Sequence, residues 1–90
     1  MSVEDMNIKL LGCMLDLCQL CNKYGLTSIE EKVHKLIYQF SNKDTPTRSI
    51  YIAAANDIGD CTIHSDELPI CVESGLIEVF DNIVSLVYLL

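Results

Sequence analysis

Four residues have the types and spacing of a tetrahedral zinc site. Cys18 and Cys21 are separated by two residues, and so are Cys61 and His64. Paired cysteine and histidine ligands at this spacing are typical of structural zinc. Such pairs usually sit on tight turns, however, whereas Cys18 and Cys21 fall within an apolar helical pattern that also includes Cys13. The pattern therefore favours buried thiols and no bound cofactor, with zinc as the alternative.

Other chemistries find less support. A redox role for Cys18 and Cys21 would need a stabilised thiolate, but both fall near the end of a predicted helix, where the helix dipole disfavours negative charge. His34 and His64 could activate a cysteine nucleophile, yet no flanking motif accompanies either of them. The acids do not follow the spacing of a calcium-binding loop. We therefore expect a protein that is not an enzyme.

The five cysteines also bear on the compartment. Their number is odd, and the chain starts with an acidic segment where a secretory signal would need basic residues. The longest uncharged run, residues 82–90, is far shorter than the ~20 residues that span a bilayer. These features predict a reduced cytoplasmic protein with no membrane segment.

The charge of the chain is concentrated in its second half. Residues 49–90 contain seven acids and neither Lys nor Arg, whereas residues 1–48 contain six acids and six basic residues. The whole net charge of −7 thus belongs to residues 49–90. Such a field repels nucleic acid and anionic lipid, and it attracts a basic protein by raising the association rate. An acidic surface that only confers solubility is the alternative.

The first half of the chain predicts two helices. Residues 3–24 have a broad apolar face, with Ser2 as the N-cap and Gly25 as the left-handed residue that ends the helix. A helix this apolar should be central and contacted on several sides. Gly12 within it marks either a close helix crossing or a tolerated glycine. Residues 27–40 follow with a capping box and a regular apolar stripe.

The second half predicts two more helices with an irregular segment between them. Thr45 and Pro46 are typical of a helix start, and the third helix should cover residues 47–58 and close at Gly59. Residues 50–52 would also fit a strand, but the alanines at 53–55 and the proline favour the helix. Residues 60–72 fit either a short hairpin or an irregular loop with a helical turn, of which the loop with a helical turn is favoured.

Ser74 should cap the last helix. Its predicted inner stripe consists of Leu76, Val79, Phe80, Ile83, Val84, Val87 and Leu90. Its predicted outer residues are Glu78, Asp81, Asn82, Ser85 and Tyr88. Residues 1–90 are therefore expected to form one all-α domain, a small four-helix bundle.

Protein binding is the function class that these patterns leave. Acids gather in the least regular segment, and functional contacts are often carried by such segments on a rigid scaffold. The predicted contact residues are Asp57, Asp60, Asp66, Glu67 and Glu73, with Tyr51 as an aromatic anchor one helical turn before them. Core packing is the alternative for Tyr51.

Two segments resemble a known class of proteins. Residues 27–36, with Ser28, Glu30 and Glu31 near their start, are similar to the second helix of the immunity proteins that neutralise DNase colicins. Residues 50–54, followed by acids and an apolar C-terminal helix, resemble the immunity proteins of tRNase colicins. Small acidic helical immunity proteins also neutralise contact-dependent-inhibition toxins. The resemblance implies an acidic face that covers the active site of a basic nuclease toxin and excludes its nucleic-acid substrate.

We therefore expect a bacterial immunity protein that binds a basic cognate toxin and neither nucleic acid nor a membrane. The alternative is a small helical adaptor, similar to a secretion chaperone, that binds an apolar segment of its partner. The wide apolar face of residues 3–24 is compatible with such a partner groove and with a homodimer.

Overall fold

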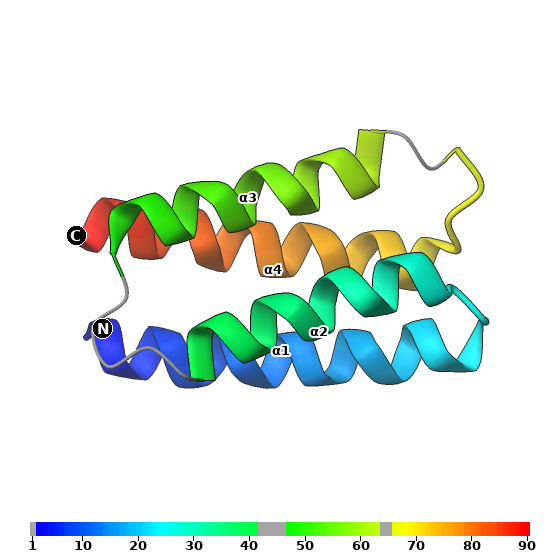
Figure 1. Cartoon of the computed structure of the whole chain (residues 1–90), viewed down its shortest axis with the longest axis horizontal. Helices are drawn as coiled ribbons and strands as arrows, with labels where there is room; N and C mark the ends of the chain where they lie inside the picture. The colour runs from blue at the N-terminus through cyan, green and yellow to red at the C-terminus, as the bar shows by residue number, and fades with distance from the viewer. Residues whose placement is uncertain (1, 42–46, 64–65) are drawn as a thin grey trace.

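The computed structural model describes residues 2–41, 47–63 and 66–90, and these residues form four helices. The helices are α1 (Val3–Lys23), α2 (Thr27–Ser41), α3 (Arg48–Ile63) and α4 (Ile70–Leu89). Each helix runs antiparallel to the one before it (Figure 1). The predicted all-α four-helix bundle is confirmed. None of the helices in the described ranges has the length and apolar character that a bilayer crossing requires.

Both ends of α1 follow from the residues predicted to form them. The Ser2 Oγ accepts a hydrogen bond from the Asp5 N–H over 3.2 Å, which caps the first turn. Gly25 has a φ of 69°, the left-handed conformation that glycine adopts without steric cost. The Leu26 N–H can then donate to the Cys21 carbonyl over 2.9 Å, which closes the helix in a Schellman motif.

Helix α3 is longer than the sequence predicts. It continues through Gly59 to Ile63, so the prediction that it closes at Gly59 is wrong. Gly59 does not adopt a positive φ, and the Thr62 hydroxyl donates to its carbonyl over 2.8 Å. The extra turn buries Cys61, which gives it a reason to form. The predicted start at residues 45 and 46 lies outside the described residues.

Helix α4 begins earlier than predicted. Pro69, not Ser74, is its N-cap, and the Pro69 carbonyl accepts from the N–H groups of Val72 and Glu73, each over 3.0 Å. Val72 is completely buried, so the added turn extends the core. Residues 60–63 and 70–72 are thus helical, against the prediction of a loop or hairpin. The described part of the segment contains no strand, and only residues 66–69 of it are irregular.

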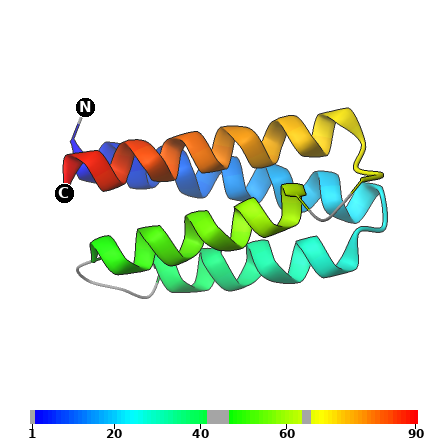
Figure 2. The same cartoon turned by 90° about the horizontal axis from the view of Figure 1, so that it is seen from above.

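The core is a single cluster to which all four helices contribute. Helix α1 packs against both α2 and α4, and α4 packs against both α1 and α3, so α1 is contacted on two sides but is no more central than α4. Helix α4 also packs closely on α3, whereas α2 and α3 contact each other only sparingly. Seen from above, the helices surround the core as two antiparallel pairs (Figure 2). Gly12 is exposed, with open space where a Cβ would lie, so it marks no helix crossing.

The buried side of α4 is rotated relative to the predicted stripe. Phe80, predicted to face inward, is 37% exposed, whereas Asn82, predicted to face outward, is 7% exposed. The Asn82 Nδ2 donates to the Cys13 Sγ over 3.4 Å, which gives this buried amide a partner on α1. The rotation arises because α4 packs on α1 as well as on α3, and the α1 side takes up positions that hydropathy alone assigns to solvent.

Candidate functional site

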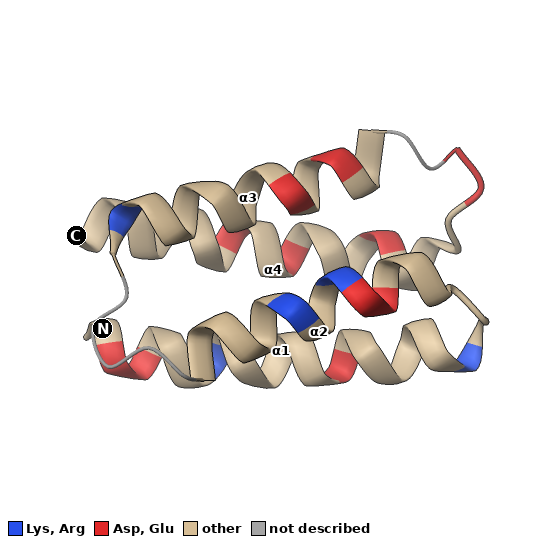
Figure 3. Ribbon diagram, viewed as in Figure 1, with Lys and Arg blue, Asp and Glu red and all other residues tan. Residues whose placement is uncertain are grey.

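The predicted acidic contact residues lie in the same half of the bundle. Asp57 and Asp60 are in the second half of α3, and Asp66 and Glu67 lie in the turn that follows it (Figure 3). Glu73 is in the first turn of α4. Four of the five are exposed, and Asp57 is half-buried. The fold therefore gathers charges that are up to 16 positions apart in the sequence.

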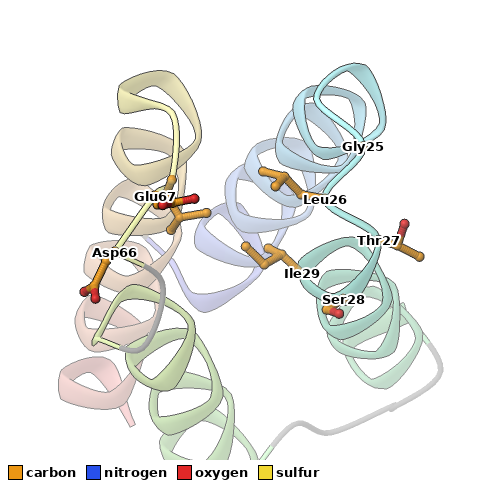
Figure 4. Close-up of a pocket in the computed structure, with 8 residues that line it drawn as sticks. Gly25, Leu26, Thr27, Ser28, Ile29, Asp66 and Glu67 are labelled. Carbon is orange, nitrogen blue, oxygen red and sulfur yellow. The ribbon is translucent and has the colours of Figure 1, made fainter.

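An open pocket of about 460 Å³ lies beside two of these acids. Asp66, Glu67 and Leu68 line it on the side of the α3–α4 turn. Leu26 and Ile29 project towards the gap from the turn between α1 and α2 and from the start of α2 (Figure 4). The pocket thus combines an apolar lining with the Glu67 carboxylate at its margin, whereas the Asp66 carboxylate points away from Leu26 and Ile29 (Figure 4). This combination suits a lysine or arginine side chain, whose stem is apolar and whose head is cationic.

Asp57 and Asp60 lie near the buried Cys61. Burial raises the pKa of the Cys61 thiol, the Lys32 ammonium on α2 lowers it, and Asp57 and Asp60 raise it, so all three charges lie close to this thiol. Asp57 is half-buried in this mixed environment. The exposed acids of the predicted set are Asp60, Asp66, Glu67 and Glu73.

Tyr51 is a core residue. Its side chain is 0% exposed, and its hydroxyl donates to the Asn7 Oδ1 over 2.8 Å. The ring packs against Phe40, with 5.1 Å between the ring centroids. An aromatic anchor needs an exposed ring, so the structure supports the core-packing alternative for Tyr51. Tyr51 is therefore not part of the candidate contact surface.

The cysteines of the predicted zinc pattern are buried. Burial, together with the neighbouring Cys18 thiol, raises the pKa of Cys21 to about 11, and Cys61 adds to the effect. Burial also raises the pKa of Cys18 and of Cys61. These surroundings disfavour the thiolate form that nucleophilic attack requires. His64, the fourth predicted ligand, lies outside the described residues.

A search of residues 2–41, 47–63 and 66–90 finds no group of three His, Cys, Asp or Glu side chains that could hold a metal ion. His34, the other candidate base, lies on the exposed side of α2. Its Nε2 is 3.5 Å from the Glu30 Oε1, one helical turn earlier. This pair is an ordinary surface contact of one helix.

The apolar side of the pocket was not apparent from the sequence. Leu26 has the properties of a helix-ending contact, and Ile29 begins the apolar stripe of α2. Their approach to residues 66–68 depends on how two distant turns come together at one end of the bundle. No family model, no curated protein and no solved structure matches the chain.

Proposed function

We propose that this chain is a non-enzymatic protein-binding domain whose acidic end binds a basic partner. The particular form we propose is a bacterial cytoplasmic immunity protein that neutralises a nuclease toxin. The observation that supports it is the open pocket in which an apolar lining adjoins Asp66 and Glu67.

The pocket suggests how a basic surface would be held. A lysine or arginine side chain of the partner would lay its stem against Leu26, Ile29 and Leu68. Its charged head would meet the carboxylate of Glu67, and Asp66 would add to the negative field nearby. A nuclease uses such cations to bind phosphate, so a protein that occupies them excludes the substrate.

The remaining acids would act over a longer range. Asp60 and Glu73 are exposed, and exposed charges contribute little to affinity in water. They do attract an oppositely charged surface before contact, which raises the association rate. The acidic half would therefore determine how fast the partner arrives, and the pocket would determine how long it stays.

The test compares two variants of equal net charge. The first, Asp60→Asn with Asp66→Asn and Glu67→Gln, removes three acids from the acidic end. The control, Asp16→Asn with Glu31→Gln and Asp81→Asn, removes three exposed acids elsewhere. The bait carries its tag at the N-terminus and is used to capture a basic nuclease from lysate of the host cell. Association with that nuclease is then measured at several salt concentrations.

The first variant should associate roughly three- to tenfold more slowly than the wild type at low salt. The difference should disappear near 1 M salt, where the Debye length falls to ~3 Å. The control should follow the wild type more closely, and the wild type should stop nucleic-acid cleavage at a 1:1 ratio. Equal association rates for the two variants, or a captured partner without basic character, would rule out the acidic end as the contact surface.

One observation favours a second function, that of a small adaptor similar to a secretion chaperone. Several large apolar side chains of α3 and α4 are exposed, among them Ile63 at 72% and Tyr88 at 82%. An apolar segment of a partner bound there would resist high salt, because burial of apolar surface does not depend on unscreened charge. Capture that survives salt and is insensitive to the three acidic substitutions would favour this function.

A further inference from the structure

The pocket at the acidic end offers a bound cation one carboxylate. Leu26 and Ile29 project into the gap from one side, and Glu67 faces them from the other (Figure 4). Leu68 adds apolar surface beside Glu67. Among the described residues that line the pocket, the only other ionisable one is Asp66, whose carboxylate points away from Leu26 and Ile29 (Figure 4). A cationic head inside the pocket would therefore be held by Glu67 alone.

The opposite wall directs a cation towards Glu67. This wall is the first turn of α2, where the helix dipole places partial positive charge. The dipole disfavours a cationic head on that side, so the apolar stem would contact Leu26 and Ile29 while the head stayed near Glu67. The hydroxyl-bearing Thr27 of this turn points away from the gap and offers the head no second acceptor (Figure 4).

We infer, on the basis of the proposed function, that the pocket selects arginine over lysine and receives one arginine side chain of the basic partner. A guanidinium group is planar, and its N–H donors form a fork that matches the two oxygens of one carboxylate. Glu67 alone can therefore hold an arginine head in a fixed orientation. The flat faces of the head are weakly hydrated and can lie against Leu26, Ile29 and Leu68.

A lysine head is less suited to the same surroundings. Its ammonium is compact and strongly hydrated, and its three N–H donors point in different directions. Glu67 lies on one side of the head, so the donors that face the apolar lining would lose water and gain no acceptor. Leaving such a donor without a partner is unfavourable. A lysine would therefore keep its head in solvent at the mouth of the pocket.

The charges outside the pocket do not contribute to the choice. Asp60, Asp66 and Glu73 attract any cation, and Lys32, one helical turn after Ser28, repels any cation. Arginine and lysine both carry one positive charge, so these long-range forces act on them alike. Selectivity must therefore come from direct contact with Glu67.

The experiment compares two small probes of equal charge, N-acetylarginine amide and N-acetyllysine amide. Each is titrated into the ¹⁵N-labelled full chain, and binding is followed by the shifts of the backbone amide resonances. Shifts that saturate should be confined to residues 26–29 and 66–68. Single side chains bind weakly, so we expect dissociation constants on the order of millimolar, with arginine at least about threefold tighter than lysine.

Two further probes separate charge from the shape of the head. N-acetylcitrulline amide has nearly the shape of the arginine probe without its charge, and it should cause no saturable shift. The symmetric dimethylarginine analogue keeps the charge but has lost the fork of N–H donors. Its affinity should fall to that of the lysine probe.

Two neighbouring acids provide matched variants. Glu67→Gln and Asp66→Asn each remove one negative charge from the same turn, and both residues are exposed, so neither change should disturb the core. Glu67→Gln should abolish the preference for arginine. Asp66→Asn should weaken both probes alike and leave their ratio unchanged, because its carboxylate acts only through the field.

Equal affinities of the wild type for the two probes would overturn the selectivity and leave the proposed function intact, since any basic partner could then use the site. A preference that survives Glu67→Gln, or is lost in Asp66→Asn, would also overturn it, because another group would then be recognising the head. Absence of saturable shifts around the pocket with either probe would overturn it as well. The proposed function is judged separately, by capture of the nuclease and its association rate.

Discussion

The seam between α2 and α3 differs completely at its two ends. At one end, the Phe40 and Tyr51 rings pack together and join the two helices. Beyond the other end, the open pocket separates the start of α2 from residues 66–68 of the α3–α4 turn, and no described residue of α3 lines it (Figure 4). One end is closed by aromatic packing, and the other is left open with a carboxylate at its margin.

The difference shows how a small bundle can keep a site without losing its core. The α1–α4, α3–α4 and α1–α2 pairs are closely packed and hold the structure together. The seam between α2 and α3 therefore needs to be closed over only part of its length. The proposed partner site lies where closure is absent, and Tyr51 lies where it is complete.

The largest effect should come from removing the closed end. Tyr51→Ala should lower the free energy of unfolding by about 3–5 kcal/mol, because a buried ring is lost and a cavity remains. Tyr51→Phe keeps the ring and loses only the hydrogen bond to Asn7, which should cost about 1 kcal/mol. Denaturant titration measures both. Equal losses in the two variants would mean that the ring does not hold the seam.

Thiol reactivity should rank the cysteines by their distance from solvent. Cys71 is exposed and should react with a disulfide reagent at pH 8 at least ~100-fold faster than Cys21. With a pKa of about 11, Cys21 is thiolate in only about one molecule per thousand at that pH. Cys13, which is half-buried, should react second. Cys61, which faces the α2–α3 seam, should react third if that seam opens transiently.

Cys71→Ser should remove the fast phase of this reaction and leave the slower phases unchanged. Modification of Cys21 ahead of Cys61 would show that α1 separates from its neighbours before α2 and α3 do. That order would contradict the view that the α2–α3 seam is the weakest part of the bundle.

The smallest effects concern two glycines. Gly12→Ala should stabilise the protein by up to about 1 kcal/mol, because the new methyl group meets open space and alanine is the better helix former. Gly75→Ala should gain less, since its Cβ would lie 3.0 Å from the Leu17 Cδ1 in the packed α1–α4 seam. Equal gains in stability from the two substitutions, measured by thermal or chemical unfolding, would mean that the α1–α4 seam is loosely packed beside Gly75.

The elements with strong local signals could be predicted. The ends of α1 rest on Ser2 and Gly25, whose effects are confined to one turn, and the stripe of α2 is regular. The end of α3 and the start of α4 could not be predicted. Burial of Cys61 and Val72 extends each helix by a turn, and only the assembled bundle shows that burial.

The candidate site could be predicted only in part. The acids were identifiable because an excess of one charge is visible in any sequence. The buried position of Tyr51 could not be identified in this way. Ile50, Tyr51 and Ile52 are all apolar, and only packing against Phe40 selects the residue that points inward. The pocket depends on two turns about 40 residues apart, which no local pattern connects.

The even number of helices brings the described ends of the chain together at one end of the bundle (Figure 1). The pocket is at the other end, along a molecule whose longest extent is 34 Å. A protein joined to either end through a short linker would therefore stand away from the pocket. The bundle could also be inserted whole into a surface loop of a carrier protein, since its adjacent ends would fit the loop while the acidic end pointed outward. The fold is thus suited to fusion with another protein or to insertion into one of its surface loops.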